Sequence, residues 1–362
     1  MIGCTPTGRH DNTVDVDSRL RRLPPIAVFC PIESAVHPQA GELEMASMQW
    51  LAGFDHLGGA EYRRRLLATR SAEFAARVAP HGILDRLQIA ADWDYWGFAF
   101  DDRSDDGALA RDLAGFVAYT HRLMRLLETP DPRTRETDPT LAAIVDLSTR
   151  FSAQVTHAQH RRWVDAHRSW LFGVTAQIAA TGVPDLDRYL TIRLNNAAGE
   201  VVTVMTELVT GYEIPDSEYS HPTIRALSEM ARLIAALDND LHSFAKTVVM
   251  GEANRQNIIE VLAVQDGCSS GSAVSRAISL RDRIMCRFLT LSARAGEFSV
   301  DTRQYIRDLG HVIRGNIDWA LTVPRYIVDG QAVSEFFSVI DTPADGSVQA
   351  PGIPCIDWWW QL

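Results

Sequence analysis

Apolar residues recur at intervals of three and four positions from about Gly41 to Ile340, and this spacing is typical of amphipathic α-helices. Runs in which apolar and polar residues alternate between turn residues, the signature of strands, are almost absent. Short connections that contain Pro or Gly separate the helical segments, as at 130–132 and 182–184. The pattern therefore predicts an all-α protein with helices over 58–78, 83–100, 107–127, 139–180, 186–211, 222–250, 271–296 and 302–328.

The connections between these helices are short, and none resembles an interdomain linker, so we expect a single helical domain over residues 26–341. Residues 1–25 are polar and predict a disordered tail. Residues 342–362 form a C-terminal tail that is rich in Pro and Gly and ends in three adjacent tryptophans, Trp358 to Trp360. We expect the tryptophans either to pack on the domain surface or at an oligomer contact, or to fold over the mouth of a pocket.

The composition narrows the class of function. The chain has 362 residues, of which 46% are hydrophobic, and a net charge of −11, which makes it a poor binder of nucleic acid or anionic membrane. Five scattered cysteines without a CxxC pair indicate neither a disulfide framework nor a zinc ribbon, and they favour a reducing cytosol. The first residues lack the apolar segment of a signal peptide, so we expect none, and no apolar run is long enough to predict a membrane span. An anionic substrate would need local cations or bound metal to overcome the acidic charge.

Four aspartates stand close together at the end of an apolar, aromatic segment that begins at Trp93. On a helix, Asp101 and Asp105 lie one turn apart on one face, and Asp102 and Asp106 are related in the same way. Carboxylates so close together repel one another unless a cation neutralises them. A solvated acidic helix end gives a similar pattern, but the apolar run here places the carboxylates at the mouth of a core. Because Mg²⁺ prefers carboxylate and water oxygens, we predict a magnesium site.

A second polar cluster lies inside the helix predicted over 222–250. Asn239, Ser243 and Thr247 recur every four residues and share one face, and Lys246 lies beside them. Amide and hydroxyl oxygens can bind Mg²⁺, and a lysine ammonium can hold a phosphate oxygen. A polar face with no ligand would explain this segment in isolation. The presence of both clusters in one chain favours a shared binding site.

Together the two clusters resemble the class I terpene synthases, and especially the bacterial cyclases. The segment from Asp101 to Asp105 reads DDRSD and matches the DDxxD motif of that family. The segment that begins at Asn239 matches the NDxxSxxKE motif at every defined position except the last. Arg193, about 46 residues before Asn239, matches the family's arginine diphosphate sensor. The family's C-terminal Arg-Tyr pair and its upstream tryptophan resemble Arg325, Tyr326 and Trp319.

The matches cover roughly residues 31–327 in family order, and they imply fold, substrate and mechanism. The resemblance implies that Mg²⁺, up to three ions with Mn²⁺ as an alternative, ionises farnesyl or geranylgeranyl diphosphate. The carbocation would then cyclise to a sesquiterpene or diterpene, and a homodimer is compatible with the sequence. The resemblance assigns metal binding to Asp101, Asp105, Asn239, Ser243 and Thr247, diphosphate binding to Arg193, Lys246, Arg325 and Tyr326, and catalysis to Asp101, Asp102, Phe98, Trp319 and Ala197.

Within this assignment, the rings of Phe98 and Trp319 would stabilise the carbocation by cation–π attraction, about 0.5–2 kcal/mol each. Tyr95 and Trp96, on the same aromatic segment, are more plausible as core residues. The resemblance also implies a helix break after Arg193, where Ala197 would direct its backbone carbonyl into the pocket as the effector.

Thr247 departs from the family pattern, because the family has a glutamate at this position. A neutral hydroxyl should hold Mg²⁺ less tightly than a carboxylate does. Three outcomes are open: coordination through the hydroxyl and water, recruitment of another acid, or a site that lacks one metal ion.

Three other functions compete with a cyclase. A chain-elongating prenyltransferase normally has a second DDxxD motif, and the segment at Asn239 is not one. A non-catalytic relative that only binds isoprenoid diphosphate is compatible with Thr247. A di-iron carboxylate bundle would need Glu and Glu-x-x-His pairs on several helices, and the sequence does not show them.

Overall fold

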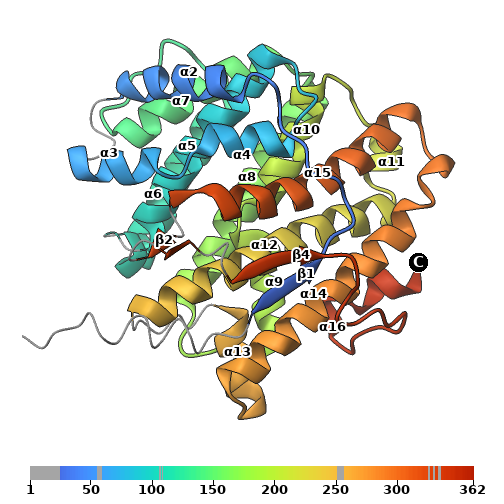
Figure 1. Ribbon diagram of the computed structural model, residues 1–362. Helices are drawn as coiled ribbons and strands as arrows, with labels where there is room; N and C mark the ends of the chain where they lie inside the picture. The colour runs from blue at the N-terminus through green and yellow to red at the C-terminus, as the bar shows by residue number, and fades with distance from the viewer. Residues whose placement is uncertain are drawn as a thin grey trace, which may run out of the picture.

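The computed structural model describes residues 25–54, 59–105, 107, 109–250, 257–324, 327–328, 331–332 and 336–362, and of residues 105, 245–250, 327–328 and 331–332 it describes the backbone alone. Helices dominate the described part of the chain, so the predicted all-α class is confirmed (Figure 1). The helices of the first half are α2 (Ala40–Ala52), α3 (Ala60–Leu67), α4 (Ser71–Val78), α5 (Leu84–Asp105), α6 (Leu113–Glu128), α7 (Pro139–Ser152) and α8 (His157–Ala179). Those of the second half are α9 (Leu186–Asn196), α10 (Gly199–Thr210), α11 (Asp216–Tyr219), α12 (Pro222–Met250), α13 (Ile258–Asp266), α14 (Ser270–Ser292), α15 (Val300–Thr322) and α16 (Pro354–Asp357).

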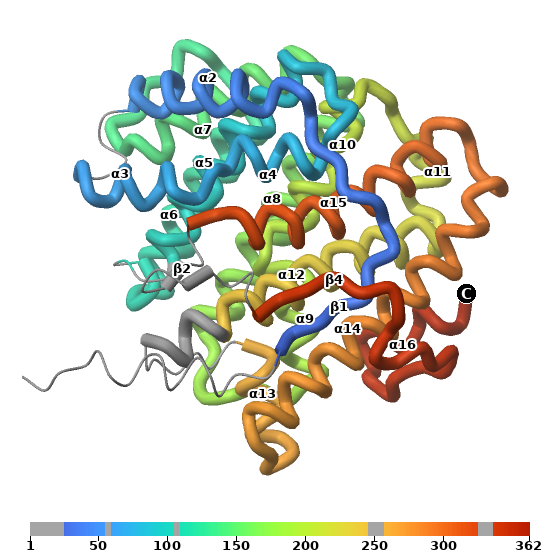
Figure 2. The backbone as a smooth tube through the Cα atoms, in the orientation of Figure 1, coloured from blue at the N-terminus to red at the C-terminus, as the bar shows by residue number. Residues whose placement is uncertain are grey.

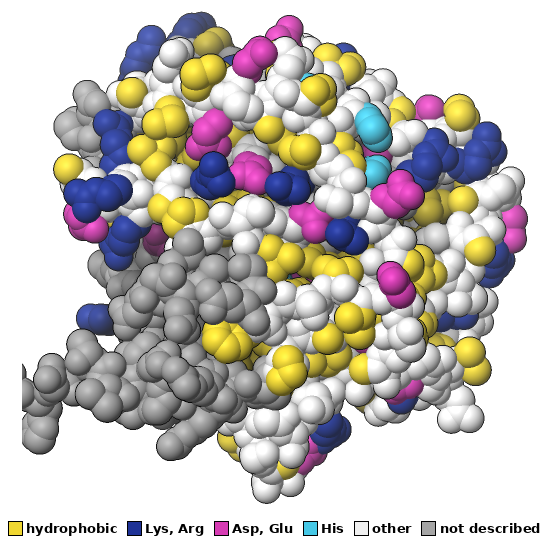
Figure 3. Space-filling view, in the orientation of Figure 1, with side chains coloured by type: hydrophobic (Ala, Val, Ile, Leu, Met, Phe, Trp, Pro, Cys, Tyr) yellow, Lys and Arg dark blue, Asp and Glu magenta, His cyan; other side chains and the backbone are white. Residues whose placement is uncertain are grey.

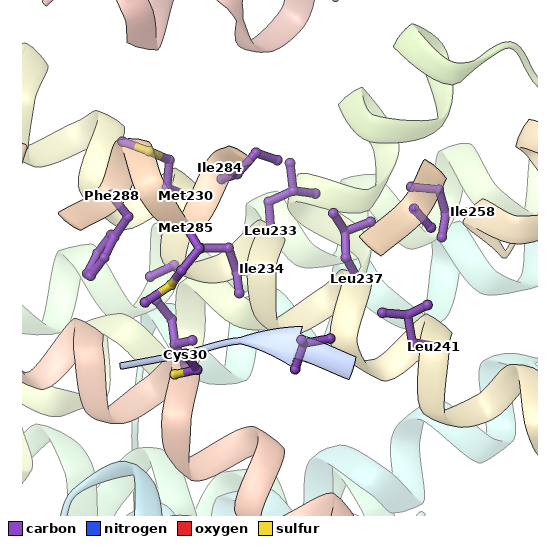
Figure 4. Close-up of a cluster of buried hydrophobic side chains, with 14 of the residues drawn as sticks. Cys30, Met230, Leu233, Ile234, Leu237, Leu241, Ile258, Ile284, Met285 and Phe288 are labelled. Atoms are coloured by element: carbon purple, nitrogen blue, oxygen red, sulfur yellow. The ribbon is translucent and has the colours of Figure 1, made fainter. Parts of the chain in front are cut away.

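Buried side chains form two hydrophobic clusters. The first, drawn in part in Figure 4, joins α12, α13, α14 and α15, and its residues on α12 include Leu233, Leu237 and Leu241. The second joins α2, α4, α5, α7, α8 and α10 and contains most of the aromatic residues of α5. Phe98 packs against both clusters, so this part of α5 lies at the boundary between them.

Three of the predicted helices are in fact pairs of helices. The predicted segment 139–180 divides into α7 and α8 because Thr156 and Gln159 form a capping box that starts a new helix. The segment 58–78 divides at Arg70, which has a left-handed backbone with φ of 47°. The segment 186–211 divides at Ala198. Four described helices lie outside the predicted segments, namely α2, α11, α13 and α16.

The sequence pattern predicted almost no strands, but a strand pair joins the first and last described parts of the chain. β1 (Ile26–Phe29) pairs in parallel with β4 (Phe337–Ile340), with Ile26 opposite Phe337. In Figure 2 the blue tube of β1 runs beside the red tube of β4. In a second pair, β2 (Ile327–Val328) is antiparallel to β3 (Gln331–Ala332). β2 lies at the end of the segment predicted as helix 302–328, which was wrong there, since α15 ends at Thr322.

A buried ion pair attaches β1 to the helices beneath it. Arg281 of α14 is completely buried and its Nε donates to the Asp238 carboxylate of α12 at 2.8 Å. The same guanidinium donates to the Phe29 carbonyl, and the Phe29 amide donates to Asp282 at 3.0 Å. Asp282 also accepts from the amide of Ala344, just after β4, at 2.9 Å. Both strands of the pair are therefore held by α14.

The tryptophan-rich C-terminus packs on the domain surface. Trp359 is completely buried, and its indole Nε1 donates to Glu229 at 3.0 Å. Arg225 lies over the ring of Trp358, and Arg287 donates to the Trp359 carbonyl at 3.0 Å. Glu229 precedes Asn239 by about 15 Å along α12, at 1.5 Å per residue, so the tail lies away from the second polar cluster.

The surface in Figure 3 shows acidic and basic side chains mixed across the face, with no continuous basic area. No described helix is both long and apolar enough to cross a membrane.

Candidate active site

The aromatic segment of α5 is fixed in the core and carries the first acidic motif to its end. Trp96 is fully buried, and its Nε1 donates to the Thr140 carbonyl of α7 at 2.9 Å. Trp93 donates to His167 of α8 at 2.9 Å. Tyr95, also fully buried, donates to Glu44 of α2. The expectation that Tyr95 and Trp96 are core residues is confirmed, and helices on several sides hold α5.

Asp101 and Asp102 lie in the last turn of α5 and are half-buried. The next two residues of the motif, Arg103 and Ser104, bind other parts of the protein. Arg103 makes two hydrogen bonds of 3.1 Å to Asp138, and the buried Ser104 donates to the Phe100 carbonyl at 3.1 Å. Asp105 is the last residue of the helix, and its side chain lies outside the described part of the structure. Arg103 and Ser104 thus anchor the end of the helix that carries Asp101 and Asp102.

Arg193 and the second motif, separated by 46 residues in sequence, meet in the structure. The Arg193 guanidinium donates from Nη2 to the Asn239 side-chain oxygen at 3.1 Å and lies 2.9 Å from the Asp240 carboxylate. Asn239 therefore already presents its amide oxygen to a cation. The same nitrogen donates to the Ala236 carbonyl at 3.1 Å, so α9 is tied to α12 at this position.

Asp240, which the sequence analysis did not single out, fixes this arginine. Its carboxylate is buried and accepts from the Tyr189 hydroxyl and from the Ile258 amide at 3.2 Å, in addition to its contact with Arg193. Burial raises the pKa of Asp240, and the charge of Arg193 opposes that shift. A sequence signal existed, because Asp240 is the second defined position of the NDxxSxxKE motif.

Ser243 lies one turn after Asn239 on α12 and is half-buried. Its hydroxyl donates to the Asp240 carbonyl at 3.2 Å. Asn257, the N-cap of α13, donates to the same carbonyl at 2.8 Å and to the Ser243 hydroxyl oxygen at 3.4 Å. The start of α13 therefore supports this part of the motif.

The helix break expected after Arg193 is present. α9 ends at Asn196, and Ala198 adopts a left-handed backbone with φ of 56° before α10 begins. Ala197 lies between the two helices, with φ of −90° and ψ of 11°. Asn196 accepts from Arg193 at 3.3 Å and donates to Gln177 of α8 at 2.6 Å, so the break is linked directly to the arginine.

Helix α15 connects the two motifs. The ring of Trp319 lies 5.6 Å from that of Phe98, one turn before the acidic motif, and its Nε1 donates to the Thr69 carbonyl at 2.8 Å. One turn earlier on α15, Asn316 donates to the Ala235 carbonyl of α12 at 3.2 Å, one turn before Asn239. Both motif-bearing helices thus contact the same end of α15.

Some predicted residues lie outside what the structure describes. These are the side chains of Lys246 and Thr247, for which only the backbone of α12 is described, and the whole of Arg325 and Tyr326. Among described side chains, no group of three His, Cys, Asp or Glu could hold a metal ion. The described donors are instead two carboxylates on α5 and an amide and a hydroxyl on α12. Such hard oxygen donors fit Mg²⁺, which completes its coordination with water and phosphate oxygens.

Comparison with known proteins agrees with this site. Residues 92–287 match the family model for terpene synthase family 2, C-terminal metal binding. Spiroviolene synthase of Streptomyces violens is 40% identical, over 93% of this chain and 96% of the relative. Phomopsene synthase of Allokutzneria albata is 35% identical, over 94% and 97%. The crystal structure of the ancestral protein SVS_A2 is 41% identical and superposes with a TM-score of 0.83, over 94% of this chain and 98% of that one. The chain therefore belongs to the class I terpene synthases, as a metal-dependent lyase that acts on an isoprenoid diphosphate.

Proposed function

We propose that the protein cyclises farnesyl or geranylgeranyl diphosphate, with Mg²⁺ as the metal, at a site formed between the ends of α5 and α12. The observation that carries this proposal is the contact between Arg193 and Asn239 at 3.1 Å. It joins a cation able to hold diphosphate to an oxygen able to hold Mg²⁺, and α15 connects that pair to the acidic end of α5.

In this proposal, the motifs hold metal and diphosphate from two sides. Asp101 and Asp105 would bind Mg²⁺ on α5, with Asp102 supporting them, and Asn239, Ser243 and Thr247 would bind it on α12, up to three ions in total, with Mn²⁺ as an alternative. The bound metal would neutralise charge on the diphosphate and so favour its departure. Arg193 would hold the diphosphate through its planar guanidinium, together with Lys246, Arg325 and Tyr326.

The residues around the hydrocarbon chain would stabilise the cation that remains. The adjacent rings of Phe98 and Trp319 lie at the boundary of the two clusters and would stabilise the cation by cation–π attraction. The carbonyl at Ala197, where α9 ends without continuing into α10, would add a dipole. Because Asn196 binds Arg193 and precedes Ala197, diphosphate binding at the arginine would directly affect the position of this carbonyl.

Thr247 sets the metal affinity of the α12 side in this proposal. Thr247→Glu restores a carboxylate, so this variant should reach half-maximal turnover at a lower Mg²⁺ concentration than wild type, with similar turnover at saturation. An inactive Thr247→Glu variant would show that the threonine itself has a specific role. Thr247→Val is the matched control, since it removes the hydroxyl, and it should require more Mg²⁺.

The reaction is tested by incubating the protein and Mg²⁺ with the C10, C15 and C20 diphosphates and analysing the organic extracts. Cyclic hydrocarbons or alcohols from the C15 or C20 substrate are the expected result, and the pair of incubations identifies the chain length. Longer prenyl diphosphates, formed when a C5 diphosphate is added, would contradict the cyclase. Tight substrate binding without any product would favour a non-catalytic binding protein.

A further inference from the structure

Asp94 is a buried carboxyl group that the proposed mechanism does not use. It lies on α5, and its side chain is only 6% exposed. No group in the described part of the chain forms a hydrogen bond or an ion pair with its carboxyl, and burial alone raises its pKa well above the usual range. Burial therefore favours the neutral form of the carboxyl, since an isolated charge is very unfavourable in such a place.

This lack of partners distinguishes Asp94 from the other buried acids. Asp92, two positions earlier, accepts from Ser47 at 2.6 Å and from Gln88 and Arg150 at 2.8 Å. The remaining acids that are buried in the described part of the structure each accept a hydrogen bond or form an ion pair, namely Glu207, Glu229, Asp238, Asp240, Asp282, Asp308 and Asp318. A polar group left unsatisfied in a folded protein calls for a functional explanation.

The position of Asp94 on α5 supplies that explanation. Asp94, Phe98 and Asp101 are spaced by four and three residues, so they share one face of the helix. Asp94 lies about 6 Å below Phe98 and about 10 Å below Asp101 along the axis, at 1.5 Å per residue. This face meets the boundary between the two hydrophobic clusters, because Phe98 packs against both of them.

The helix positions next to Asp94 carry mostly small side chains. The positions one turn away on the helix are Ala90, Ala91, Gly97 and Phe98, so three of the four carry the smallest side chains. An isoprenoid chain whose diphosphate is bound at Asp101 would pass Phe98 and reach the depth of Asp94 with its middle carbons. The carboxyl would then face hydrocarbon on which positive charge develops.

We propose that Asp94 lines the hydrocarbon end of the pocket and directs the course of cyclisation by placing a carbonyl oxygen beside one cationic carbon of the chain. The inference rests on the proposed cyclase function. The oxygen stabilises the positive charge through its dipole and forms no bond. The acid must keep its proton in this role, because a carboxylate would take a proton from the cation or capture it as an ester.

The experiment compares Asp94→Asn with Asp94→Leu, and the readouts are product composition, KM and kcat. Asn keeps a neutral carbonyl of the same shape, so it should retain the wild-type main product. Leu removes the dipole, and the ratio of the main product to the other products should fall by about fivefold, as expected when one cationic path loses roughly 1 kcal/mol relative to its competitors. KM should stay within about twofold, because the diphosphate site is intact. Identical products from Leu and wild type would overturn the proposal, as would Leu-like products from Asn.

Asp92 provides the matched control, because it is equally buried but has three partners. Asp92→Asn should lower the melting temperature and leave product composition unchanged. Asp94→Leu should keep or raise the melting temperature, since no hydrogen bond is lost. A destabilised Asp94→Leu would overturn the claim that this carboxyl lacks partners, whatever the products are. Failure of the proposed function would be distinguishable from failure of the Asp94 proposal, because the wild-type protein itself would then make no cyclic product.

Discussion

Two buried carboxyl groups, Asp240 and Asp94, show how much the surroundings of a single residue determine its role. Asp240 forms an ion pair with Arg193 and accepts from Tyr189, so it holds a cation in a fixed place. Asp94 has no such partner among the described residues, and burial raises its pKa well above the usual range, which favours its neutral form. The Arg193 cation that Asp240 holds suits binding of an anion, and the neutral form of Asp94 suits contact with hydrocarbon.

Removal of the Tyr189 hydroxyl should weaken both folding and diphosphate binding. Tyr189→Phe deletes a hydrogen bond to a charged, buried group, so the free energy of unfolding should fall by about 1.5–3 kcal/mol in denaturant titrations. Arg193 also loses part of its support, and kcat/KM should fall. Tyr305→Phe, which removes a 2.8 Å contact with Ser228, is the control and should leave kcat/KM unchanged. Equal kinetic effects of the two substitutions would contradict this role of Tyr189.

The pH dependence of stability tests the neutral state of Asp94. Its raised pKa means that the folded protein keeps a proton that the unfolded chain loses above about pH 4. The free energy of unfolding therefore falls as pH rises above 4, by up to about 1.4 kcal/mol per pH unit, until the folded pKa is reached. Asp94→Asn carries no such proton, so its stability advantage over wild type should grow with pH. A constant difference between pH 4 and pH 8 would contradict the assignment.

At the scale of elements, the site depends on the close approach of α8 to the end of α9. A Cβ added at Gly173 would lie 2.7 Å from the Asn196 amide and 2.8 Å from the Asn195 Cβ, closer than atoms can approach. The end of α9 carries Arg193 and Asn196, which bind each other. The glycine thus allows α8 to support the diphosphate-binding arginine.

Gly173→Ala should accordingly force α8 and α9 apart. The expected cost is about 1–3 kcal/mol in the free energy of unfolding, since the clash is with backbone. Turnover should fall because Arg193 and Asn196 move with α9. Ala198→Gly at the nearby helix break is the control, and it should change stability by less than about 1 kcal/mol, since glycine accepts positive φ freely. Wild-type turnover in Gly173→Ala would show that α9 tolerates the displacement.

The sequence predicted the elements of the site better than their boundaries. The periodic pattern located α5 and α12, because that signal is local, but it ran through the break after Asn196. Only the family resemblance implied that break. The division between α7 and α8 was missed, although the capping residues Thr156 and Gln159 were visible in the sequence. The role of Asp240 was not foreseen, since it depends on contacts with Tyr189 on another helix.

At the scale of the whole molecule, the strand pair that joins the chain ends could not be predicted. β1 and β4 are four residues each, and their partners come from opposite ends of the sequence, so no local pattern marks the pairing. Their attachment depends on Arg281, which is buried between α12 and β1 and interacts with Asp238, Asp282 and the Phe29 carbonyl.

Loss of Arg281 should destabilise the whole protein. Arg281→Met leaves Asp238 and Asp282 buried without their cation, so the free energy of unfolding should fall by about 3–5 kcal/mol. The double variant Arg281→Met with Asp238→Leu should recover part of this loss, since it removes one uncompensated charge. Arg294→Met, which breaks an exposed pair with Glu297, is the control and should be neutral. The stability of each variant is measured by denaturant unfolding. An Arg281→Met variant as stable as wild type would contradict the proposed anchoring of β1.

The central claim is that the motifs at the ends of α5 and α12 form one metal-dependent diphosphate site. Calorimetric titration with inorganic diphosphate, with and without Mg²⁺, tests this claim most directly. We predict binding only with Mg²⁺, strong weakening by either Asp101→Ala or Asn239→Ala, and a double variant that loses less than the sum of the two, as expected for groups that share a ligand. Asp112→Ala, which alters an exposed helix cap on α6, should bind as wild type does. Wild-type affinity in either motif variant, or tight binding without Mg²⁺, would contradict the account.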